Sequence, residues 1–120
     1  MHVDEARWTE GGPVLPESYP GYGEQLIGDL ESGPWVFVMH LAPGFVGPPH
    51  AHDRDEVMYI LEGEMITEGR SCGPGTVIYL QRETEYSFNV GPKGVRFLNM
   101  RPAPAMSKYQ GEEEWKNTRS

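Results

Sequence analysis

Short apolar runs separated by turn residues fill most of the chain between residues 25 and 100. The run 35–42 is rich in aromatic and β-branched residues, which favour strands. Residues 86–90 alternate apolar and polar positions, as a strand with one buried face does. The remaining runs cover 25–30, 57–61, 65–67, 76–80 and 95–100. Because turn signals recur roughly every 8 to 12 residues, the pattern predicts about seven or eight strands in an antiparallel sandwich or small barrel.

Glycine and proline between these runs predict how the strands connect. Glu62-Gly63-Glu64 is expected to turn the chain back as a hairpin, and the Gly-Pro-Lys-Gly segment 91–94 is expected to form a second turn. The strands that flank Glu62-Gly63-Glu64 carry apolar residues at both odd and even positions, and therefore on both faces. One of their faces is therefore expected inside the barrel, and the other either under the N-terminal arm or in a homodimer contact.

The expected domain organisation follows from where this pattern begins and ends. Residues 1–23 are polar with several Pro and Gly and are predicted to form an extended N-terminal arm. Residues 24–101 are predicted to form the barrel, and 102–120 a C-terminal tail. A length of 120 residues fits one domain with one modest core.

Composition excludes several classes of protein. The 26 Gly and Pro residues (15 and 11) exclude a helical bundle, and a hydrophobic fraction of 38% excludes a disordered chain. A formal net charge of −8 argues against partners that are nucleic acids or anionic membranes. One cysteine, Cys72, excludes an internal disulfide and a Cys-based zinc site. With no signal peptide or membrane-spanning run visible, we expect a soluble protein of the reducing cytoplasm.

The chemistry is concentrated in one segment. His50 and His52 are two residues apart, and Pro48-Pro49 before them favours an extended backbone, so both imidazoles should point to one side. Glu56 follows at the start of the next strand. Two imidazoles and one carboxylate form a set that suits a divalent transition metal with open positions for substrate or oxygen.

These residues resemble the first motif of the cupin superfamily. That motif reads Gly, five residues, His-x-His, three or four residues, Glu, six residues, Gly, and it is matched here by Gly44, His50, His52, Glu56 and Gly63. The resemblance covers about residues 24–101. It implies an all-β fold, namely a small cupin-type β-barrel built as a jelly-roll-like double antiparallel sheet, with a small-molecule ligand in its mouth.

The second cupin motif is degenerate in this chain. Only Gly75 is retained, and Tyr86 stands where the family usually has a histidine that supplies a fourth metal ligand. Three alternatives stay open. Tyr86 ligates the metal together with His50, His52 and Glu56, or it faces the substrate beside a three-ligand site. In the third, no metal is bound and the two histidines and Glu56 act as acid–base groups.

The resemblance implies first a metal-dependent enzyme on a small organic substrate, with an oxygenase of the dioxygenase type favoured. Fe(II) is the favoured ion, with Mn, Ni or Zn as alternatives, and Tyr86 or Tyr59 would orient the substrate. His40 shares its parity with Val36 and Val38, which would place it near the metal. Two further hypotheses are a metal-free isomerase, dehydratase or cyclase that uses a histidine base with Tyr86 or Glu56 as acid, and a ligand-binding protein without turnover.

Overall fold

Strands make up nearly all of the regular structure. The computed structural model describes residues 2–5, 21–28 and 31–117. Its elements are the 3-10 helix η1 (Val3–Glu5) and the strands β1 (Gly21–Ile27), β2 (Trp35–Leu41), β3 (Val46–His52), β4 (Glu56–Thr67), β5 (Arg70–Cys72), β6 (Val77–Leu80), β7 (Tyr86–Arg101), β8 (Met106–Tyr109) and β9 (Lys116–Asn117). All strand pairs among them are antiparallel. The predicted all-β, jelly-roll-like fold is confirmed.

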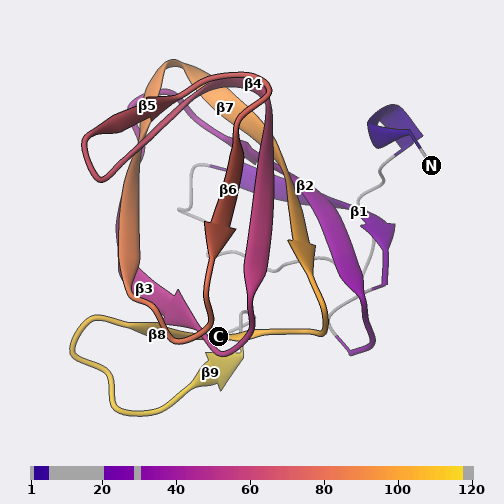
Figure 1. The fold of residues 1–120 in the computed structure, drawn as a ribbon, viewed down its shortest axis with the longest axis vertical. Coiled ribbons are helices and arrows are strands. Elements are labelled where there is room, and N and C mark those ends of the chain that lie inside the picture. The colour runs from indigo at the N-terminus through magenta and orange to yellow at the C-terminus, as the bar shows by residue number, and fades with distance from the viewer. Residues whose placement is uncertain (1, 6–20, 29–30, 118–120) are drawn as a thin grey trace.

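The sheet curls back on itself around one core (Figure 1). Its main path runs β1-β2-β7-β3-β8-β9, and β4 lies along β7 while carrying β5 and β6. The buried apolar side chains of this core are Trp35, Phe37, Met39, Leu41, Met58, Ile60, Met65, Cys72, Phe88, Val90, Val95 and Phe97. Among the described residues, no helix is both long and apolar enough to span a membrane.

The two glycine-rich segments predicted as turns are corners inside long strands, so that prediction is wrong. β4 runs unbroken through Glu62-Gly63-Glu64, and β7 runs unbroken through 91–94. The strands stay paired with each other here, with bulges on either side of the register pair Gly63–Val95. Gly63 has φ +80°, and a Cβ on it would lie 2.0 Å from the Gly94 carbonyl oxygen. Glycine is used at this point for a close approach of two backbones in a bent ladder rather than for chain reversal.

The ends of the chain extend the sheet beyond the barrel boundaries expected from sequence. β1 begins at Gly21, and most of the predicted arm, residues 6–20, lies outside the described residues. The predicted tail contains β8, which pairs with the second half of β3 in the register His50–Tyr109 and His52–Ser107. The C-terminal segment therefore lies directly beside the two histidines.

Candidate functional site

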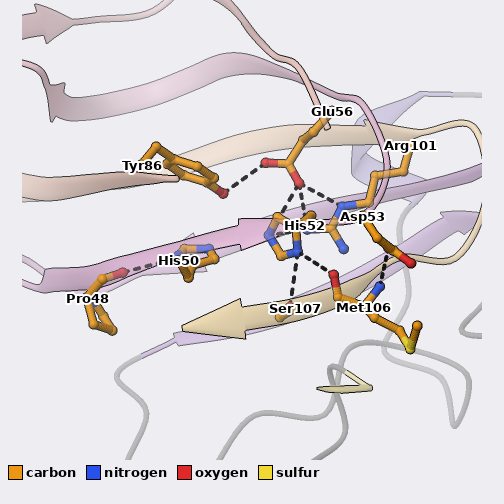
Figure 2. A network of polar contacts seen from close by, with 9 residues as sticks. All are labelled: Pro48, His50, His52, Asp53, Glu56, Tyr86, Arg101, Met106 and Ser107. Atoms are coloured by element: carbon orange, nitrogen blue, oxygen red, sulfur yellow. Dashed lines mark hydrogen bonds and ion pairs between the residues drawn. The ribbon is translucent and has the colours of Figure 1, made fainter. Parts of the chain in front are cut away.

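The structure brings His50, His52, Glu56 and Tyr86 together on the inner side of the barrel (Figure 2). The rings of His50 and His52 on β3 are 4.9 Å apart between centroids, and the ring of Tyr86 on β7 lies 4.6 Å from that of His50. Glu56 begins β4 and its side chain is only 1% exposed. The Tyr86 hydroxyl donates a hydrogen bond of 3.1 Å to Glu56 Oε1. Three strands, β3, β4 and β7, thus converge on one buried polar cluster.

Arg101, which the sequence analysis did not select, is the closest partner of this cluster. Its Nε and Nη2 lie 2.7 and 2.6 Å from Glu56 Oε2, and its Nη2 lies 3.3 Å from His52 Nε2. The guanidinium carbon lies 5.2 Å from the centroid of the Trp35 ring. One signal was available in the sequence, because Arg101 has the same strand parity as the apolar Val95 and Phe97 and should point inward with them.

The partners of His52 define its tautomer. An arginine nitrogen only donates, so His52 Nε2 must accept from Arg101 and carries no proton. The proton is therefore on Nδ1, which lies 3.0 Å from Ser107 Oγ and 3.3 Å from the Met106 carbonyl oxygen. Burial and the charge of Arg101 lower the pKa of His52 to about 3. His52 is thus neutral at pH 7, and both of its nitrogens are engaged.

His50 differs because its Nε2 has no hydrogen-bond partner within the described part of the chain. Its Nδ1 lies 2.9 Å from the Pro48 carbonyl oxygen, which only accepts, so Nδ1 carries the proton and Nε2 the lone pair. Burial lowers the pKa of His50 from its ordinary value of 6.5, against smaller opposing effects. The Tyr109 ring of β8 stacks on the His50 ring, with 5.2 Å between the ring centroids. His50 can therefore act as a neutral base at Nε2.

Glu56 is held ionised by its surroundings. Burial by itself raises the pKa of this carboxyl, but the charge of Arg101, the neighbouring His52 and the hydrogen bonds from Arg101 and Tyr86 together outweigh burial and lower the pKa to about 2. Its two oxygens accept from Tyr86 and Arg101, and its charge offsets that of Arg101. With both histidines neutral, this cluster carries no net charge at pH 7.

The structure does not bring His40 and Tyr59 to this cluster. β2 buries its odd-numbered residues in the core, which leaves His40 on the opposite face, where its Nε2 lies 2.7 Å from Glu24 Oε1. Tyr59 lies between two core residues of β4 and is 37% exposed on the outer side. The parity of His40 with Val36 and Val38 does not indicate its face, because every other residue in 35–42 is apolar and no alternation is visible there.

The donor set, as arranged, does not fit a metal ion. A metal at the motif would need lone pairs from His52 and Glu56. His52 Nε2 and Glu56 Oε2 are directed at the Arg101 guanidinium, and Glu56 Oε1 accepts from the Tyr86 hydroxyl. Within the described part of the chain, which includes all four sequence-predicted ligands, no group of three or more His, Cys, Asp or Glu side chains is arranged to hold a metal ion. The Arg101 guanidinium, a side-chain cation, already contacts both His52 and Glu56, as a metal ion at the motif would.

The fold and the cluster together define a small antiparallel β-barrel with a buried histidine–carboxylate site. The family model for the cupin domain matches residues 37–101, and the chain belongs to this family. No curated protein matches the sequence at a significant level.

Several solved structures share the fold. An RmlC-like cupin from Ralstonia eutropha superposes with a TM-score of 0.72 at 13% identity, covering 96% of this chain and 76% of its own. The polyketide cyclase RemF from Streptomyces resistomycificus gives 0.66 at 23% identity, with 95% and 86% covered. Salicylate 1,2-dioxygenase from Pseudoaminobacter salicylatoxidans gives 0.64 at 13% identity, covering 86% of this chain but only 32% of the dioxygenase. At these identities the likeness concerns the fold alone.

Proposed function

We propose that this cupin is a metal-free acid–base enzyme that moves protons on a small organic substrate, in the manner of an isomerase, dehydratase or cyclase. The observation that carries the proposal is the position of Arg101, whose guanidinium engages both Glu56 Oε2 and His52 Nε2. The site thereby has a built-in cation where the motif implied a metal. The polyketide cyclase among the structures of similar fold supports this class of chemistry without identifying the substrate.

Each residue has a distinct role in the proposed reaction. His50 Nε2 removes a proton from a carbon next to a carbonyl group, and the electron pair of that C–H bond moves onto the carbonyl oxygen. The Tyr86 hydroxyl turns its proton from Glu56 toward this oxygen and stabilises the negative charge. The proton on His50 then returns to a different atom of the substrate, which completes an isomerisation.

The remaining residues of the cluster position these two groups. Glu56 anchors Tyr86 through one oxygen and Arg101 through the other. Pro48 and Tyr109 hold the His50 ring so that Nε2 stays unprotonated. Glu56 itself is a poor proton donor, because its lowered pKa keeps it ionised at neutral pH.

A metal-dependent oxygenase is the second candidate, since the first cupin motif is intact, many cupins bind metal, and a dioxygenase shares the fold. It would require Arg101 to release His52 and Glu56 so that the metal could bind there. A ligand-binding protein without turnover, a cytoplasmic location and a homodimer also stay predictions.

Metal content and proton exchange test the proposal together. We expect less than one equivalent of Fe, Mn, Ni or Zn per chain after reconstitution and dialysis. Deuterium exchange of C–H groups next to carbonyls, followed by NMR on a panel of small ketones and oxo acids, should be insensitive to chelator. His50→Gln should abolish exchange and Tyr86→Phe should reduce it about 100-fold. The matched controls His2→Gln and Tyr79→Phe lie on the exposed surface and should leave it unchanged.

One result would contradict the proposal and support the oxygenase. It is a stoichiometric metal that is required for turnover and is lost from a His50→Ala, His52→Ala double variant. Absence of exchange with every carbonyl compound, together with unaltered ligand binding in His50→Gln, would instead favour a binding protein.

A further inference from the structure

Three buried polar atoms have no hydrogen-bond partner within the described residues. They are Gln25 Nε2, Asn99 Oδ1 and Arg101 Nη1. Their residues are only 7%, 4% and 7% exposed. Buried polar groups in native proteins are nearly always paired, so three unpaired ones in one small barrel call for a ligand or bound water.

Sheet register places these residues near one another on the inner face. Gln25, Phe37 and Asn99 are direct neighbours across β1, β2 and β7, and Trp35 is the cross-strand neighbour of Arg101 one step along. The Arg101 guanidinium lies 5.2 and 5.4 Å from the Trp35 and Phe37 ring centroids. The residues that carry the three unpaired atoms are therefore cross-strand neighbours of one pair of aromatic side chains, Trp35 and Phe37.

For Gln25 and Arg101, the paired atoms of the same side chain show which atom is left free. The Trp35 indole only donates, and it donates a 2.6 Å hydrogen bond to Gln25 Oε1, so the free end of Gln25 is its NH₂ group. Arg101 contacts Glu56 through Nε and Nη2, so the free nitrogen of its guanidinium is Nη1. These atoms offer two donors, from Gln25 and Arg101, and one acceptor, from Asn99.

We propose that Gln25, Asn99 and Arg101 form a subsite that recognises a neutral hydroxycarbonyl group, a carbonyl oxygen with a hydroxyl on the adjoining carbon. The carbonyl oxygen accepts from Arg101 Nη1 and Gln25 Nε2, and the hydroxyl donates to Asn99 Oδ1. That this group belongs to the substrate rests on the proposed function, and it is a carbonyl group other than the one whose oxygen Tyr86 stabilises. The two aromatic rings make the apolar surroundings of the group.

Charge decides between a carbonyl and a carboxylate at this subsite. Glu56 already offsets the charge of Arg101, and the side chain of Glu56 is 1% exposed. A carboxylate would add a second buried anion with no further cation among the three residues, which is costly. A neutral carbonyl oxygen takes the same hydrogen bonds without that cost.

The test uses three probes with one phenyl body: α-hydroxyacetophenone, acetophenone without the hydroxyl, and the anion mandelate. Binding is followed by NMR titration in buffer with EDTA. We expect α-hydroxyacetophenone to bind about tenfold more tightly than acetophenone and more tightly than mandelate. Asn99→Leu should weaken the binding of α-hydroxyacetophenone about tenfold and leave that of acetophenone unchanged. It should also raise the Tm of the free protein, because the buried Oδ1, which has no partner among the described residues, is replaced by an apolar group of similar size. Asn89→Leu, the same change at an exposed position of β7, should alter neither affinity.

Several results would overturn the proposal. If Asn99→Leu lowers the Tm and keeps all affinities, the three atoms hold a structural water. If mandelate binds most tightly, the subsite takes an anion. If none of the probes distinguishes Asn99→Leu from Asn89→Leu, there is no such subsite. None of these readouts depends on turnover or metal, so they separate this inference from the proposed function, which the metal content tests.

Discussion

The substitution Arg101→Met tests the feature on which the proposed site depends. The Glu56 side chain, 1% exposed, receives Arg101 Nε at 2.7 Å and Nη2 at 2.6 Å, and otherwise the Tyr86 hydroxyl at 3.1 Å. Removing one member of a buried ion pair typically costs about 3–5 kcal/mol. The pKa of Glu56 agrees in direction, because it lies below its ordinary value of 4.5 although burial alone would raise it.

Urea unfolding at pH 7 measures the loss directly. Arg101→Met should lower the free energy of unfolding by about 3–5 kcal/mol, a large part of the roughly 5–15 kcal/mol of an ordinary domain. The double variant Glu56→Met, Arg101→Met should lie within about 2 kcal/mol of the natural protein, because no charge is left unpaired. Arg96→Met is the matched control. Arg96 pairs with Glu62 and Asp4, which are both largely exposed, and its loss should cost less than about 1 kcal/mol.

The pH dependence of the free energy of unfolding is a second, independent test of the Glu56–Arg101 ion pair. In the natural protein the folded-state pKa of Glu56 is depressed, so its contribution is present above pH 4.5 and is lost as the pH falls toward 2. In Arg101→Met the carboxyl is buried without a cation, its folded-state pKa rises, and protonation relieves the cost. The stability gap between the two proteins should therefore narrow as the pH falls from 7 to about 4. A loss under about 1 kcal/mol with no narrowing would refute the buried pair.

Three further predictions concern the frame around the site. Gly63→Ala should cost more than about 2 kcal/mol in thermal unfolding, because the new Cβ would lie 2.0 Å from the Gly94 oxygen at φ +80°. Ser107→Ala should cost about 1 kcal/mol and shift the ¹⁵N resonances of His52, whose Nδ1 lies 3.0 Å from Ser107 Oγ; unchanged resonances would argue against the assigned tautomer. Because the folded-state pKa of His52 is about 3 against 6.5 when unfolded, its contribution is present above pH 6.5 and is lost as the pH falls toward 3. His52→Gln should flatten that part of the stability curve, and a profile as steep as that of the natural protein would contradict a buried neutral His52.

The strands were predictable where apolar and polar positions alternate, but the continuous course of β4 and β7 through their glycine-rich segments was not. Residues 86–90 show the buried face of β7 in their alternation. Gly63 and Gly94 looked like turn residues because glycine with positive φ serves turns and close backbone approaches equally. Only the pairing of β4 with β7 distinguishes the two uses, and that pairing joins residues about 30 positions apart in sequence.

The candidate site was predictable to the extent that it is local in sequence. His50 and His52 share a side because an extended backbone has a period of two, and Glu56 follows within one short loop. Ser107 and Tyr109 reach the histidines through the pairing of β8 with β3, across more than 50 residues. Their segment has no clear strand pattern, so it looked like a tail.

Arg101 shows why a motif match locates donors without determining what they bind. The motif specifies His52 and Glu56, but the charge that meets their lone pairs comes from the far end of β7, more than 40 residues later. A metal ion and a guanidinium can both neutralise a buried carboxylate, but the two kinds of site support different reactions. The metal leaves open coordination positions, whereas the guanidinium leaves a fixed cation and a neutral base on His50. If Arg101→Met were to acquire a stoichiometric metal that the natural protein does not bind, that single change would show that the arginine, and not the motif, decides between the two.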